Sequence, residues 1–226
     1  MIPSKGPRNI TNLARLPSEF KFVMRVISFG LVAGLVSSIG ISTLIVMVEK
    51  VTTTPVGAFY IVLVSAMTQS YGYSIYMILA GLLLHLVAGG LIGAIMAIPF
   101  TIRVINNDRR TVIRTVNRYA PVYGLCFGFV LWVLLFIPIT YFMVIPALNN
   151  IKQAPAITQQ DPTGRIASLL IDDILSMENK IVIGALAFNM FYGLVAAIII
   201  NSLYTNYLNR KSWYKEDIVH QIDDKI

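Results

Sequence analysis

Two polar side chains, His85 and Asn189, lie inside long apolar runs of this sequence. The stretch "GLLLHLVAGGLIGAIM", residues 81–96, contains His85 and no other polar side chain. A histidine has an unperturbed pKa near 6.5, so a small shift would let it relay protons or sense pH inside a membrane. Asn189 offers hydrogen bonds but does not titrate. The pair could therefore support hydrogen bonding or, at His85 alone, proton transfer.

The favoured interpretation of these residues is packing. His85 and Asn189 would hydrogen-bond each other, or they would bond a hydroxyl of Ser37, Ser38 or Thr43. Such interhelical bonds contribute about 0.6 to 2 kcal/mol each. The alternative is that His85 titrates or binds a solute near the bilayer midplane.

A metal or haem site is the least favoured interpretation, because one intramembrane histidine cannot build a site alone. Cys126 is the single cysteine, so paired-thiol ligation is excluded. The sequence has no phosphate-binding glycine loop, no nucleophile elbow and no HExxH motif. We therefore expect no catalytic residues, no cofactor and no metal.

Four apolar segments must position these polar groups. The chain has 226 residues, of which 56% are hydrophobic and 13% charged. A bilayer core about 30 Å thick needs roughly 20 apolar residues in a helix, and four segments meet that need. The sequence predicts an all-α polytopic membrane protein with a cytoplasmic N-terminal segment (1–21), a four-helix membrane domain (22–205) and a cytoplasmic tail (206–226). The predicted transmembrane helices are 22–48, 76–102, 119–145 and 181–204.

Basic residues flank these segments unevenly. Of the 18 lysines and arginines, 14 lie before or at the start of the first segment, between the second and third, or after the fourth. The positive-inside rule then places both termini in the cytoplasm. We expect a multi-pass protein of the cell membrane, that is, the inner or plasma membrane. The same placement argues against nucleic acid as a partner and favours the lipid bilayer.

The chain also resembles a duplication. Aligning residues 83–96 with 187–200 places His85 on Asn189 and Gly89 on Gly193, and aligning 30–36 with 124–130 places Gly30 on Gly124. We expect two parallel repeats, about 22–102 and 119–205, related by an axis along the membrane normal.

Each repeat has a short additional segment on the predicted outer side. In the first, residues 55–67 are too short to span and predict a re-entrant or interfacial helix capped by Thr54. In the second, residues 161–180 predict a helix along the membrane surface. Glu49 and Lys50 end the first spanning helix, and we expect them to be a solvated pair.

Small residues recur every four positions on the predicted helices. This spacing lets helix backbones approach closely where lipid provides no hydrophobic force. We expect the following glycines to form the packing faces: Gly30, Gly34, Gly81, Gly89, Gly93, Gly124, Gly128 and Gly193.

The stretches "HLVAGGLIGA", "FNMFYGLVAA", "GLVAG" and "GLCFG" resemble the YagU-like family of small four-helix inner-membrane proteins, over about residues 22–205. The resemblance implies a fold rather than a mechanism, and asparagine replaces histidine in the second copy.

These observations give two hypotheses for function. Because intramembrane polar groups are few, the first is a non-enzymatic structural or accessory subunit, with a membrane-protein partner or self-association. The repeat keeps a second hypothesis open, a small transporter or channel for protons or small solutes with His85 at the midplane.

Overall fold

A computed structural model describes residues 16–68, 74–106, 109–153, 171–172, 175–176 and 178–223. No strand occurs in these ranges. The helices are α1 (Leu16–Val51), α2 (Ala58–Thr68), α3 (Ile75–Asn106), α4 (Arg109–Leu131), the π-helix η2 (Trp132–Phe136), α5 (Ile137–Ile139), the π-helix η3 (Thr140–Val144), α6 (Ile145–Gln153) and α8 (Glu178–Asp223).

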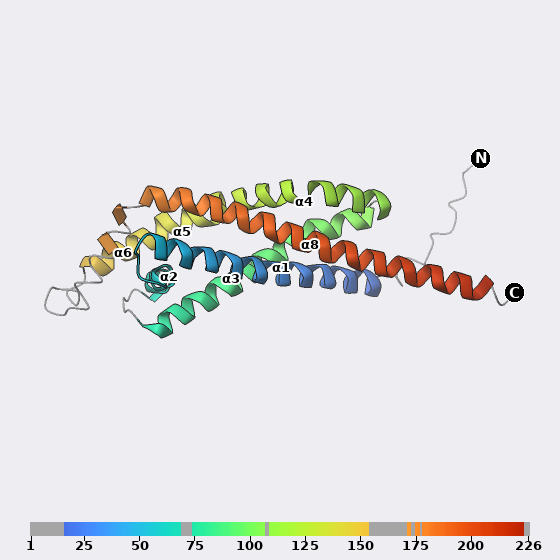
Figure 1. The fold of residues 1–226 in the computed structure, drawn as a ribbon, viewed down its shortest axis with the longest axis horizontal. Coiled ribbons are helices and arrows are strands. Elements are labelled where there is room, and N and C mark those ends of the chain that lie inside the picture. Colours follow the sequence, from blue (N-terminus) through green and yellow to red (C-terminus); the bar gives the residue numbers. More distant parts are fainter. Residues whose placement is uncertain are drawn as a thin grey trace, which may run out of the picture.

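Four helical segments are long and apolar enough to cross a membrane. They are Phe20–Val51, Ile75–Thr101, Arg118–Asn150 and Asn179–Leu208. The prediction of an all-α chain with four such helices and a short apolar helix, α2, is therefore confirmed. The first helix begins and α8 ends at the same end of the bundle (Figure 1), as an even number of crossings requires.

The long helices lie in the order α3, α1, α8, α4, with α1 and α8 in the middle. Figure 1 shows α4 along one edge of the bundle and the first half of α3 along the other. The core lies where α1, α3 and α8 meet, and includes Val26, Met96, Ile200 and Tyr204, each fully buried.

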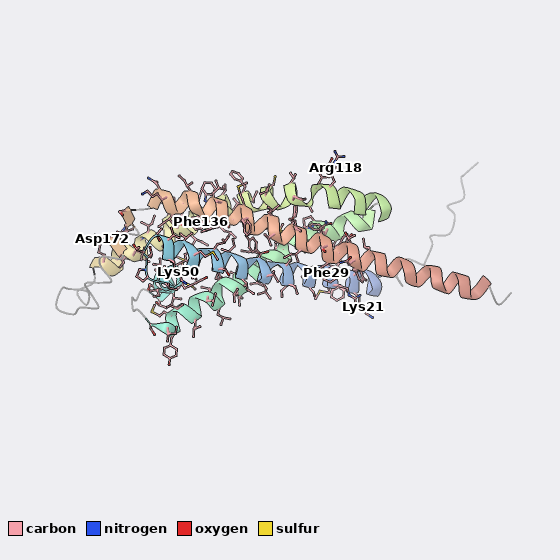
Figure 2. All side chains as sticks on the ribbon, in the orientation of Figure 1. Lys21, Phe29, Lys50, Arg118, Phe136 and Asp172 are labelled. Carbon is pink, nitrogen blue, oxygen red and sulfur yellow. The ribbon has the colours of Figure 1, made fainter. Side chains whose placement is uncertain are left out.

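Charged side chains keep to the ends of the spans. Figure 2 shows Lys21 and Arg118 toward one end of the bundle, and Lys50 and Asp172 toward the other. Between them the surface is largely apolar, with Leu83 63% exposed to the surroundings. This distribution is the one a bilayer selects, because an unpaired charge in the hydrocarbon core is costly.

The third spanning segment is continuous but irregular. Two π-helical turns, η2 and η3, interrupt it, and Pro138 and Pro146 each follow a π turn by two residues. Proline has no backbone N–H and its ring clashes with the carbonyl four residues earlier. The wider π turn relieves that clash, so the N–H groups of Ile137 and Ile145 bond carbonyls five residues back.

The short helix α2 follows α1 after a tight turn. Figure 1 shows it nearly end-on, so it lies across the bundle rather than along it. Its N-terminus is capped by Glu49, whose carboxylate accepts the N–H groups of Gly57 and Phe59 at 2.8 and 2.9 Å. Two expectations are therefore wrong: Thr54 does not cap this helix, and Glu49 is 5% exposed rather than solvated. A carboxylate here satisfies two donors that α2 cannot satisfy itself.

The second predicted outer helix, residues 161–180, lies mostly outside the described residues. Within it, Asp172 pairs with Lys152 of α6 at the surface.

Candidate functional site

The two helices of the first repeat cross at glycines. A methyl group on Gly30 would overlap the carbonyl oxygen of Gly93, and one on Gly34 would overlap that of Gly89. A methyl group on Gly93 would in turn overlap the carbonyl oxygen of Gly30. Backbones this close leave no room for any side chain between α1 and α3 at the crossing.

The second repeat contains the same kind of crossing between α4 and α8. A methyl group on Gly124 would overlap the carbonyl oxygen of Gly193, and one on Gly128 would overlap that of Asn189. A methyl group on Gly193 would overlap the carbonyl oxygen of Gly124. The backbones of α4 and α8 therefore approach each other as closely as those of α1 and α3.

These contacts correct the alignment of the two copies. Gly30 meets Gly93 in the first repeat and Gly124 meets Gly193 in the second, so Gly93 corresponds to Gly193. By the same contacts Gly89 corresponds to Asn189. His85 then corresponds to Ala185 rather than to Asn189, and the sequence alignment is wrong by one helical turn.

His85 lies against α2 rather than against the second repeat. Its ring makes edge-on contacts with Phe59 at 6.1 Å and Tyr60 at 6.2 Å, and its other neighbour is Ser38 of α1. Gly81, one turn before His85, lets the Tyr60 backbone approach α3, since a side chain there would meet the Tyr60 carbonyl at 2.6 Å. The imidazole thus lies in a compartment formed by α1, α2 and α3.

Asn189 makes a local bond instead of a pair with His85. Its amide Nδ2 donates to the carbonyl oxygen of Ala185, one turn earlier on α8, at 2.8 Å. The hydroxyls of Ser37 and Thr43 likewise donate to carbonyls of their own helix. The structure therefore does not bring His85 and Asn189 together by a hydrogen bond, and two of the three expected hydroxyl partners are already engaged.

Around His85, four side chains have a buried polar atom with no hydrogen-bond partner in the described part of the chain. They are Ser38, Ser42, Tyr60 and His85 itself. Sequence reasoning missed Tyr60, because its contact with His85 depends on the turn that brings α2 back to α1. The one usable signal was the spacing of Ser38, Ser42 and Glu49, which places them on one face of a helix.

The second repeat has no such polar face. The residues 94 positions later than Ser38, Ser42 and Glu49 are Trp132, Phe136 and Met143. The one polar atom of the Trp132 side chain already has a partner, since its indole N–H donates to the carbonyl oxygen of Val182 at 2.9 Å. Among the described residues, the polar compartment is therefore found in the first repeat only.

Two tyrosines of the second repeat bond the backbone of α3. The Tyr192 hydroxyl donates to the carbonyl oxygen of Gly89 at 2.5 Å, and that of Tyr123 donates to the carbonyl oxygen of Met96 at 2.9 Å. They link the second repeat to α3.

The chemistry available in this compartment is neutral hydrogen bonding. Among the described residues, no group of three or more histidine, cysteine or acidic side chains could hold a metal ion. The one acidic group nearby, Glu49, already accepts two backbone N–H groups.

Comparison of the chain with protein-family models, with curated proteins and with solved structures found no match.

Proposed function

We propose that this chain is a non-enzymatic membrane protein that acts as a structural or accessory subunit of a larger membrane complex. It would reside in the cell membrane with both termini cytoplasmic, as its basic residues indicate. Membership of the YagU-like family belongs to the same proposal and rests on the glycine and histidine pattern.

The observation that carries the proposal is the exposure of the third spanning segment. Only 11% of its most apolar stretch is buried within the chain, against 33% for the first and fourth segments. It is also the segment with two π turns, which are frequent at functional sites. Its exposed large hydrophobic side chains include Val133, Leu134, Leu135, Ile139, Tyr141, Phe142 and Met143.

The glycine crossings support the same conclusion from the opposite direction. Because backbones touch at Gly93 and at Gly193, neither helix pair leaves space for a substrate at the crossing. A rigid bundle with one largely uncovered helix suits a subunit that packs against another membrane protein.

Site-specific photo-crosslinking tests the proposal in native membranes. A benzoyl-phenylalanine in place of Phe142, which is 84% exposed, should form an adduct with a second, different membrane protein. The same probe in place of Leu83, on the opposite edge of the bundle, is the matched control and should give lipid adducts only. Extraction in mild detergent and a native gel should then show a complex larger than a monomer. A lone monomer or a homodimer, without an adduct at position 142, would refute the accessory role.

The second candidate is a small transporter or channel for protons or small solutes. One observation favours it: the polar atoms gathered around His85 in otherwise apolar surroundings. Purified protein in liposomes should then dissipate an imposed pH gradient, and His85→Asn should abolish that flux while leaving the protein folded, because an amide does not titrate. Liposomes that hold the gradient would exclude proton conduction.

A further inference from the structure

A polar stripe runs along one face of α1 in the first repeat. Ser38, Ser42 and Glu49 are separated by four and seven residues, which is the spacing of one helix face. From Ser38 to Glu49 the helix rises about 16 Å at 1.5 Å per residue. The stripe therefore extends from the end of the bundle that carries α2 toward the middle of the membrane.

Side chains of α2 and α3 cover this stripe. The Tyr60 hydroxyl lies beside Ser42, and the imidazole of His85 lies beside Ser38 and against the Tyr60 ring. His85 is ten residues into α3, or about 15 Å from Ile75. Ser38 is 1% exposed and Tyr60 is 3% exposed, so lipid does not reach their polar atoms.

Each of these four groups has a polar atom that makes no hydrogen bond of standard geometry in the described part of the chain: Ser38 Oγ, Ser42 Oγ, Tyr60 Oη and His85 Nε2, with Tyr60 Oη and Ser42 Oγ close enough to interact only weakly. A buried, unsatisfied donor or acceptor costs about 1 to 3 kcal/mol. Buried polar side-chain atoms nearly always have a partner in the protein or in ordered water. Four of them in one compartment therefore require a common explanation.

The chemistry of the lining selects the occupant. Three hydroxyls and an imidazole can both donate and accept hydrogen bonds, and none carries a permanent charge. Such a lining favours a small neutral molecule with donors and acceptors over an ion. Buried water makes about three hydrogen bonds to groups of this kind.

We propose that α1, α2 and α3 of the first repeat enclose a water-binding site, lined by Ser38, Ser42, Tyr60 and His85 and approached from the Glu49 end. The site hydrates His85 near the middle of the spanning segment. The second repeat lacks one, because Trp132, Phe136 and Met143 replace the polar stripe. The proposal does not depend on the accessory role, and its test is independent of partner binding.

Solid-state NMR of the full chain in lipid bilayers tests the proposal directly. The sequence has two histidines, so His220→Gln leaves His85 as the only ¹⁵N-histidine signal. Magnetisation transferred from water should reach the His85 ring nitrogens at short mixing times. An ordered imidazole signal without that transfer would show that the compartment is dry and that its hydroxyls pair with one another.

Two substitutions on neighbouring residues locate the water. Ser42→Val fills the compartment with a methyl group and should abolish the transfer. Thr43→Val is the matched control, because the Thr43 hydroxyl already donates to the carbonyl of Ile39 on its own helix at 3.0 Å. It should leave the transfer unchanged. If Ser42→Val does not fold, Ser42→Ala should still reduce the transfer. Equal loss in the Ser42 and Thr43 variants would place the water elsewhere and overturn the proposal.

Discussion

The two repeats cross their helices in the same way, yet they differ one turn beyond the crossing. At the crossing, Gly93 and Gly193 occupy equivalent places against partner glycines. Beyond it, the first repeat has Ser38 opposite Gly89, whereas the second has Trp132 and Asn189 at the corresponding positions. The backbone contact tolerates only glycine. The neighbouring positions accept either small polar side chains, as in the first repeat, or an aromatic side chain, as in the second.

The two repeats also differ in what covers the helix face that follows the crossing. Glu49 folds α2 back over the first repeat, so its polar stripe is covered by protein. In the second repeat the residue 94 positions after Glu49 is Met143, which is 39% exposed and lies in a π turn. The first repeat thus encloses a compartment, and the second presents an apolar surface.

The largest expected effect comes from breaking what the repeats share. Gly93→Leu and Gly193→Leu should each separate a helix pair and prevent assembly of a folded bundle, since even a methyl group overlaps partner backbone. Size-exclusion profiles and unfolding in mixed detergent would measure the loss. Gly40→Ala is the matched control, because nothing in the described structure lies within 4 Å of its added methyl group. It should be neutral or stabilise by about 0.5 to 1 kcal/mol through helix propensity. Equal tolerance at positions 40 and 93 would contradict the crossing.

The next effect tests the corrected alignment. Gly89→Ala should destabilise by about 1 to 3 kcal/mol, because the methyl group would overlap the Ser38 hydroxyl. Its counterpart Asn189 already accommodates a side chain, so Asn189→Ala should cost about 0.6 kcal/mol, the value of one intramembrane hydrogen bond. Adding Ser38→Gly to Gly89→Ala should recover part of the loss. A harmless Gly89→Ala would show that Ser38 does not block a side chain at position 89.

A similar or smaller effect is expected at the cap of α2. Glu49→Ala leaves the N–H groups of Gly57 and Phe59 buried without an acceptor, at a cost of about 1 to 3 kcal/mol. Faster hydrogen exchange of those two amides would report it. Ile183→Ala, at an exposed position of α8, should leave α2 unchanged. Slow exchange at Gly57 in the Glu49 variant would disprove the capping role.

The smallest effect is expected at His85. His85→Asn should change the free energy of unfolding by less than about 0.6 kcal/mol, because no described side chain depends on a hydrogen bond from His85. His85→Leu should cost slightly more if water bonds the imidazole, since the water would lose one partner. Both values follow from unfolding in mixed detergent. A loss of several kcal/mol in His85→Asn would mean that the ring bonds a group outside the described residues.

Much of this fold is predictable because lipid imposes it. Apolar length set the four spans, and small residues every four positions marked the glycine faces, with boundaries near those of the described helices. The recurrence of small residues every four positions also explains why the alignment of the repeats was wrong. Because Gly89 and Gly93 are one turn apart, a shift of four residues still places glycine on glycine and remains attractive in an apolar sequence.

The compartment around His85 was harder to predict because it depends on tertiary contacts. Glu49 caps a helix eight residues further along the chain, and only the turn through Gly57, with φ of 88°, brings the two together. The π turns of the third span depend on how the helix accommodates Pro138 and Pro146, which sequence periodicity does not record.

The length of α8 has a mechanical consequence. From Gly193 to Asp223 it contains neither glycine nor proline, and as one unbroken helix it continues for about 22 Å past the last spanning residue, Leu208. About 45 Å of helix therefore lies beyond its crossing with α4. A tilt of about 5° at that crossing moves the far end by about 4 Å, on the basis of this helical rise. The helix is a lever arm with its pivot at the glycine crossing, so a small change in packing there becomes a displacement of several ångström at the far end, on the order given by this helical rise.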